Sequence, residues 1–283
     1  MSEAGARGVM PVPVCPRHPD RESYVRCQRC ERPTCAECQR DAAVGIQCVD
    51  CVRESAQGVR EARTAFGGRV GDGRPLVTYT VIGACVVTFV LQLASPAVTS
   101  ALAFAPALAE SEPWRFVTSA FLHSTGLFFH ILLNMYALWL IGPYLESLFG
   151  RARFAAFYLT SAIGGSVGFL LLAEPVNQFG QLTSTVGASG AVFGLFGALV
   201  IVQRKLGRDL GQILVLIGIN TVLGFVIPNI AWQAHLGGLV TGVAVAAALA
   251  YAPRERRTAV QTGGLALVVV LLLAAAVLGL SRV

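Results

Sequence analysis

Residues 210–253 read LGQILVLIGINTVLGFVIPNIAWQAHLGGLVTGVAVAAALAYAP, a run of 44 positions without a single Asp, Glu, Lys or Arg. A helix needs about 20 consecutive apolar residues to cross the hydrocarbon core of a bilayer, so this run is long enough for two crossings. Pro228 and Asn229 interrupt the run, and proline breaks a helix because it lacks a backbone N–H. We therefore predict two membrane-spanning helices here, at 211–227 and 232–250.

The rest of the chain beyond residue 74 has the same character. Further uncharged stretches of 35, 30, 20, 29 and 24 residues separate its charged positions. Over the whole chain 54% of residues are hydrophobic, the mean hydropathy is +0.63 and 13% of residues are charged, against about 25% in a typical soluble domain. This composition excludes a disordered chain and argues against a soluble enzyme. We predict an all-α polytopic membrane protein, with further spans at 76–94, 127–145, 154–172, 186–203 and 264–280.

The first 75 residues have a different composition. They carry 12 of the 21 Arg, 10 of the 16 acidic residues and seven of the eight Cys. We predict a small soluble module at 1–53 and a mobile juxtamembrane linker at 54–75, because the linker region is rich in Gly and Arg and ends at Pro75. The chain starts without an apolar run, so we expect no cleavable signal peptide.

Cysteine and histidine in this module recur at the two-residue spacing typical of metal ligands. The four pairs are Cys15 and His18, Cys27 and Cys30, Cys35 and Cys38, and Cys48 and Cys51. Eight ligands suffice for two tetrahedral zinc sites, one with three Cys and one His and the other with four Cys. A segment this short, with few large apolar side chains, cannot fold by burial alone and needs a metal. We therefore predict a zinc-binding module with two structural Zn²⁺ ions.

Two other uses of these cysteines are disfavoured. Stable disulfides do not suit the cytoplasmic location inferred below, and four regular pairs do not suit a single redox dithiol. The sequence does not fix which pairs share a metal. Alternate pairs, the first with the third and the second with the fourth, are favoured over sequential pairs.

Cationic residues gather in alternate loops between the predicted spans. Those loops contain Arg151, Arg153, Arg204, Lys205, Arg208, Arg254, Arg256 and Arg257, whereas the opposite loops contain only Arg115. Positive loops stay on the cytoplasmic side, so we expect a cytoplasmic N-terminus and an extracytoplasmic C-terminus in the plasma membrane. The basic residues do not form one patch, so the net charge of +6 predicts no nucleic-acid partner.

Polar side chains inside the predicted spans are the candidates for function, because such groups are costly in a bilayer. His130 and Asn134 have i, i+4 spacing and share one helix face. Ser189 opens the span at 186–203, and His235 lies early in the span at 232–250. Each residue alone has an ordinary structural explanation, such as a serine bonding its own helix carbonyl. All four, however, fall at one depth near the outer face, and together they indicate a site.

Small residues explain how these helices could meet. One stripe consists of Gly190, Gly194 and Gly197, and the other of His235, Gly238 and Gly242. Glycine lets helix backbones approach closely in lipid, which would set Ser189 opposite His235. Ordinary helix packing explains the glycines equally well, and the two explanations are compatible. A serine needs an adjacent base to become a nucleophile, and histidine is the usual one.

The predicted spans supply no acidic third member for a catalytic triad. Glu146 and Glu174 lie at span ends, away from the depth of Ser189. The arrangement therefore predicts a Ser–His dyad. His130 and Asn134 suit another role, because an imidazole N–H and a side-chain amide can stabilise a tetrahedral oxyanion.

Four motifs together resemble the rhomboid family of intramembrane serine proteases. They are His130-x3-Asn134, the Gly187-Ala188-Ser189-Gly190 string, His235 followed by Gly238 and Gly242, and Trp114-Arg115. The resemblance covers residues 76–253 and implies a six-helix protease core, with residues 254–283 adding a loop and a seventh span. It implies a ring stacked on His235, and Phe193 stands where the family often has tyrosine. The zinc module more weakly resembles a B-box.

The resemblance implies a serine endopeptidase that cleaves transmembrane protein substrates within the lipid bilayer, near its outer face. The zinc module would bind a cytoplasmic protein partner or regulate the core. Two other functions compete with this interpretation. A catalytically silent rhomboid-like binding or quality-control factor would be expected to lack Ser189 or His235, and both are present. A transporter would more often show internal repeats or mid-membrane charges.

Overall fold

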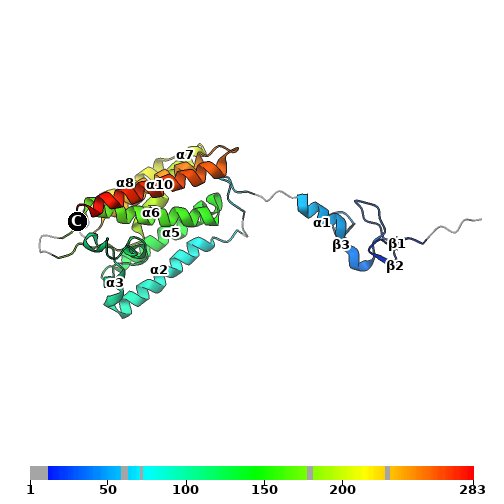
Figure 1. Cartoon of the computed structure of the whole chain (residues 1–283), viewed down its shortest axis with the longest axis horizontal. Helices are drawn as coiled ribbons and strands as arrows, with labels where there is room; N and C mark the ends of the chain where they lie inside the picture. The colour runs from blue at the N-terminus through cyan, green and yellow to red at the C-terminus, as the bar shows by residue number, and fades with distance from the viewer. Residues whose placement is uncertain (1–11, 59–62, 71–72, 177–180, 227–229) are drawn as a thin grey trace, which may run out of the picture. The chain divides into compact units, whose positions relative to one another are not determined.

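The computed structural model describes residues 12–58, 63–70, 73–176, 181–226 and 230–283. The chain divides into two compact units, residues 1–61 and residues 62–283. Each unit is described by itself below, and Figure 1 labels most of their helices and strands.

The described part of the N-terminal unit contains two small hairpins, a 3-10 helix and an α-helix. Strands β1 (Val14–Cys15) and β2 (His18–Glu22) pair antiparallel, as do β3 (Gln39–Asp41) and β4 (Ile46–Cys48). A short 3-10 helix, η1 (Ala36–Cys38), precedes β3, and helix α1 (Val49–Gly58) follows β4. The buried hydrophobic residues described in this unit are all cysteines: Cys15, Cys27, Cys35, Cys38, Cys48 and Cys51. Within residues 12–58 the unit therefore lacks an ordinary apolar core, as expected of a module that a metal holds together.

Helices dominate the C-terminal unit. Its long helices are α2 (Leu76–Ala94), α5 (Phe128–Phe149), α6 (Arg151–Leu172), α7 (Ser189–Lys205), α8 (Gly211–Val226), α9 (Trp232–Ala250) and α10 (Arg257–Leu280). By length and composition α2, α5, α6, α9 and α10 could each cross a membrane, whereas α7 and α8 are shorter, at 17 and 16 residues. This architecture confirms the predicted all-α, multi-pass membrane fold.

The helix ends differ from the predicted spans at several places. Helix α5 continues to Phe149, past Glu146, and α10 begins at Arg257, seven residues before the predicted position 264. The predicted break at 228–229 lies outside the described residues. Short helices connect α2 to α5: α3 (Pro96–Leu102), η2 (Pro106–Leu108), α4 (Arg115–Thr118) and η3 (Ser119–Phe121).

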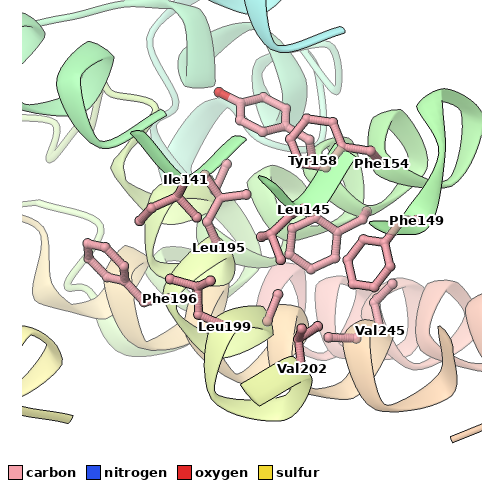
Figure 2. Close-up of a cluster of buried hydrophobic side chains, with 14 of the residues drawn as sticks. Ile141, Leu145, Phe149, Phe154, Tyr158, Leu195, Phe196, Leu199, Val202 and Val245 are labelled. Carbon is pink, nitrogen blue, oxygen red and sulfur yellow. The ribbon is translucent and has the colours of Figure 1, made fainter. Parts of the chain in front are cut away.

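The core of this unit lies where α5, α6, α7 and α9 meet. Figure 2 shows large side chains from these helices interdigitating, among them Leu145, Phe149, Phe154, Leu195 and Val245. Helix α7 packs mainly against α9 and α6, and its central residues are almost all buried. By contrast only 6% of the apolar window in α10 is buried, so most of that helix is left to face lipid. Burial therefore concentrates on the helix that begins at Ser189.

Residues 63–70 are attached to the helical unit rather than free. The Phe66 ring is buried and lies 5.7 Å from the Phe149 ring, centroid to centroid. Gln261 of α10 donates a hydrogen bond to the Phe66 carbonyl (2.9 Å), and Gly68 lies against the Gly150 backbone. This packing differs from the predicted mobile linker at 54–75, of which residues 54–58 are also helical as the end of α1. A buried aromatic residue anchors a stretch that composition alone marked as a linker.

Candidate active site and metal centres

Ser189 is the first residue of α7, and Gly187 shapes the approach to it. Gly187 has a φ of +132°, a conformation that residues with a side chain rarely adopt. A Cβ built on Gly187 would lie only 2.8 Å from Cε1 of His130, and 3.5 Å from the Ser189 Oγ. The Gly187 N–H donates to the Ser119 carbonyl (3.0 Å), which ties the segment before α7 to η3. Glycine here lets His130 and Ser189 approach each other.

Helices α7 and α9 touch backbone to backbone. A Cβ built on Gly238 would overlap the Gly190 backbone, and one built on Gly242 would overlap the Gly194 backbone. Gly190 in turn lies against Ala234, because a Cβ built on Gly190 would lie 3.3 Å from the Ala234 carbonyl oxygen. The structure therefore places the two predicted glycine stripes face to face. That contact sets residues 189–190 beside residues 234–235.

His235 is held by an aromatic stack rather than by a carboxylate. Its ring lies parallel to that of Phe193, with centroids 4.2 Å apart and an interplanar angle of 12°. Among the described residues, Nδ1 of His235 has no hydrogen-bond partner. Glu146 is occupied elsewhere, because its carboxylate accepts hydrogen bonds from the N–H of Val77 and from the N–H and hydroxyl of Thr78. Within the part of the chain that the structure describes, His235 is thus an imidazole stacked on a ring, with no carboxylate bound to its Nδ1 atom.

His130 and Asn134 both lie in the first two turns of α5. The Nδ1 atom of His130 accepts a hydrogen bond from the Ser124 N–H (3.1 Å). Its Nε2 atom points the other way and would lie 2.9 Å from a Cβ on Gly187. One N–H of the Asn134 amide donates to the His130 carbonyl (2.7 Å), and the second remains available to a ligand. His130 therefore faces the start of α7 at Gly187, and Asn134 lies one turn further along the same face of α5.

His130, Ser189 and His235 lie near the N-terminal ends of α5, α7 and α9, where Gly187 separates His130 from Ser189 and Gly190 packs against Ala234. Ser189, His130 and His235 are each half-buried, so each keeps an accessible edge, whereas Asn134 is 7% exposed. A helix N-terminus adds a partial positive charge at Ser189. The site thus contains a hydroxyl, an imidazole held by an aromatic stack, and nearby N–H donors. Such groups are the parts of a site for nucleophilic attack on a carbonyl.

The eight metal-ligand candidates of the N-terminal unit form two clusters. Cys15, His18, Cys35 and Cys38 make the first cluster, and Cys27, Cys30, Cys48 and Cys51 make the second. The ligand atoms of each cluster lie within 4.8 Å of one another, and sulfur atoms around a tetrahedral zinc lie about 3.8 Å apart. The distances from His18 Nδ1 to the Cys35 and Cys38 sulfurs are 3.2 and 3.4 Å. This grouping is the alternate one, and it is compatible with two bound metal ions.

The chemistry of both clusters suits a cation. The backbone N–H of Cys35 lowers the pKa of the Cys15 thiol to about 6, which favours the thiolate that binds metal. Burial raises the pKa of the Cys51 thiol to about 12, because it disfavours the charged thiolate. The three neighbouring sulfurs of the cluster shift this pKa in the same direction. A bound cation supplies the positive charge that holds all four sulfurs of such a cluster as thiolates.

A family model, the Rhomboid domain, matches residues 110–252, half of the chain. The chain belongs to the rhomboid family. The matched region contains the four residues of the candidate active site and helices α5 to α9. The resemblance seen in the four motifs is thereby confirmed.

Individual relatives agree with this membership. Rhomboid protease GluP of Bacillus subtilis is 36% identical over 191 residues, which cover 63% of this chain and 36% of that protein. RHOMBOID-like protein 5 of Arabidopsis thaliana is 37% identical over 141 residues, 47% of this chain and 43% of that protein. RHOMBOID-like protein 1 of the same plant is 40% identical over 139 residues, 46% of this chain and 33% of that protein. The chain thus spans less than half the length of these three rhomboid relatives.

Two features of this rhomboid site escaped the sequence analysis. Helix α6 carries a third small-residue stripe. Gly164 and Gly168 lie against Gly237 of α9, and Gly165 lies against Gly190 of α7. The string Gly164-Gly165-x2-Gly168 could have revealed it. Gln92 in α2 and His123 before α5 are also fully or almost fully buried at the edge of the site. The signal for Gln92 was its polar side chain within a predicted span.

Proposed function

We propose that this rhomboid protein is an intramembrane serine endopeptidase in which Ser189 is the nucleophile and His235 the base. The observation that carries the proposal is the meeting of Ser189 with His130 at Gly187 while α7 and α9 touch through glycine. Backbone contact of that kind leaves little freedom in the placement of Ser189 and His235, and a defined placement is what a Ser–His dyad needs.

The reaction follows from the roles of these groups. His235 takes the proton of the Ser189 hydroxyl as the oxygen attacks the scissile carbonyl and opens its C=O double bond. His130, Asn134 and the backbone N–H of Ser189 stabilise the oxyanion that forms. The oxyanion collapses, the C–N bond breaks, and His235 gives its proton to the leaving amine. His235 then takes a proton from water as the water oxygen attacks the acyl carbonyl, the ester bond to Ser189 breaks, and His235 returns that proton to the Ser189 oxygen.

The substrates we propose are transmembrane proteins, cleaved near the outer membrane face. The positive loops support an orientation with a cytoplasmic N-terminus, which sets the N-terminal ends of α5, α7 and α9 toward the outer side of the plasma membrane. Water reaches a shallow site there. An intact helix hides its carbonyls in hydrogen bonds to residues four positions on, so a substrate with Gly or Pro near its outer end is favoured.

The N-terminal unit holds two structural Zn²⁺ ions and takes no part in the chemistry. The two clusters, one of three Cys and one His and the other of four Cys, support zinc, since each offers four ligands of the type that zinc prefers. The unit would bind a cytoplasmic protein partner. It supplies no catalytic group, because each cluster uses its four ligands for a structural metal.

The test compares Ser189→Ala with the wild-type chain in nanodiscs, using a reporter transmembrane substrate and a fluorophosphonate probe. Wild type is expected to cleave the reporter and bind the probe covalently, and the variant to do neither while remaining folded. Ser161→Ala is the matched control, because Ser161 is a buried membrane serine of α6 whose hydroxyl has no partner among the described residues. Probe labelling of Ser189→Ala, or no cleavage by wild type, would contradict the proposal and favour a catalytically silent rhomboid-like factor.

A further inference from the structure

Gln92 lies in the last turn of α2, and the described hydrogen bonds of its side chain go to the segment that precedes α5 and to α3. It is 3% exposed. Its Oε1 accepts the backbone N–H of His123 (2.9 Å), and its Nε2 donates to the His123 carbonyl (3.0 Å) and to Thr99 Oγ1 (2.9 Å). These three bonds fix which end of the amide is oxygen and which is nitrogen. Gln92 therefore clamps the backbone of His123 on both sides.

The clamped carbonyl belongs to the same peptide group as the N–H that reaches His130. The His123 carbonyl and the Ser124 N–H are the two polar atoms of one planar, trans peptide, so they point in opposite directions. The carbonyl faces Gln92, and the N–H donates to Nδ1 of His130 (3.1 Å). Hydrogen bonds arranged in such a chain also polarise one another. By holding the carbonyl, Gln92 fixes the direction of the N–H.

That direction decides where the proton of the His130 ring resides. A neutral imidazole has one donor and one acceptor nitrogen, and a backbone N–H can only donate. Since Nδ1 accepts the Ser124 N–H, the ring proton is on Nε2, which faces Gly187 and the Ser189 hydroxyl. If the peptide were turned over, its carbonyl would face Nδ1 and would draw the ring proton there. Nε2 would then be an acceptor, unable to stabilise an oxyanion.

We infer that Gln92 is a positioning residue that holds His130 in the Nε2–H tautomer through the His123–Ser124 peptide. The inference rests on the proposed function only for its kinetic consequence, because the tautomer itself is a property of the resting protein. His123 adds nothing to the clamp through its ring, since neither ring nitrogen has a hydrogen-bond partner among the described residues. Only its backbone is used.

The first readout is spectroscopic. The full chain is labelled with ¹⁵N-histidine in nanodiscs, and two-bond ¹H–¹⁵N correlations separate the two tautomers of each ring. The His130 signal is assigned by its loss in His130→Ala. Wild type is expected to show His130 protonated on Nε2, and Gln92→Met, which keeps the side-chain length without the amide, to show a gain of the Nδ1–H form. An unchanged tautomer in Gln92→Met would overturn the inference, whether or not the chain cleaves a substrate.

The second readout is kinetic. Loss of one oxyanion donor typically lowers kcat by about 10²–10³-fold, so Gln92→Met is expected to fall toward that range with KM unchanged. Because Gln92 acts through His130, adding Gln92→Met to His130→Ala should cost little more. Thr99→Val is the matched control, since it removes a bond of Gln92 without touching the clamped peptide, and it should keep the tautomer and kcat. Losses that multiply in the double variant would refute the role of Gln92, whereas an inactive wild type with the expected tautomers would refute the proposed function alone.

Discussion

Replacing Gly238 by alanine tests whether the contact between α7 and α9 sets the site. The added methyl would overlap the Gly190 carbonyl oxygen and would lie 2.5 Å from its carbon and 2.9 Å from the Gly190 Cα. Carbon atoms in contact lie about 3.5–4.0 Å apart, so the helices must separate by about 1 Å. No side-chain rotation relieves this clash, because every atom involved belongs to the backbone. Overpacking of this kind costs about 1–3 kcal/mol of stability.

The expected effect on activity is larger than the effect on folding. A misplacement of about 1 Å between reacting groups can cost about 10²-fold in rate, and Gly238 lies one turn from His235. Cleavage of the reporter substrate in nanodiscs should therefore fall about 10²-fold, at a temperature where circular dichroism shows the variant folded. Gly83→Ala in α2 is the matched control, because a Cβ there has no neighbour within 4 Å. Wild-type cleavage by Gly238→Ala would refute the argument that backbone contact positions the dyad.

Three further predictions follow from the site and the two units. Asn134→Ala should remain measurable, with kcat lower by about 10²–10³-fold, whereas His235→Ala should show no cleavage; equal losses would contradict their different roles. Elemental analysis of the full chain should find about two zinc ions per chain, and none in a chain that begins at Arg63. That shorter chain should keep the full-length cleavage rate in detergent. Phe66→Ala should destabilise the helical unit by about 3–5 kcal/mol in thermal unfolding, because it empties a buried aromatic position; an unchanged melting temperature would show that residues 63–70 add nothing.

Hydropathy predicted the helices well, and its errors have identifiable causes. An acidic residue usually ends an apolar span, but Glu146 remains inside α5 because the first N–H groups of α2 and the Thr78 hydroxyl bind its carboxylate. Helix α10 begins early because Gln261, a polar residue, is buried against the Phe66 and Leu249 carbonyls. In both cases a partner distant in sequence satisfies the polar group. A local pattern cannot contain that information.

The candidate site likewise combines features that a local sequence pattern contains with contacts between residues distant in sequence. The spacing of His130 and Asn134 and the glycine stripes are local, and the structure brings those residues together. Gln92 acts on a peptide bond 31 residues away, and its role depends on which atoms of that peptide face it. Phe66 is a single aromatic residue in a Gly- and Arg-rich stretch, where nothing in the composition predicts burial. Such contacts become visible only in three dimensions.

The backbone contacts among α6, α7 and α9 also bear on how this protein can be redesigned. Gly165, Gly190, Gly238 and Gly242 each face main-chain atoms of a neighbouring helix. A larger residue at one of these positions cannot be compensated by a smaller residue on the partner helix, because glycine is already the smallest. Mutant libraries that vary them in pairs would therefore recover few functional clones. Only 6% of the apolar window of α10 is buried, so its outward face imposes no such limit and is the place to introduce labels or crosslinkers.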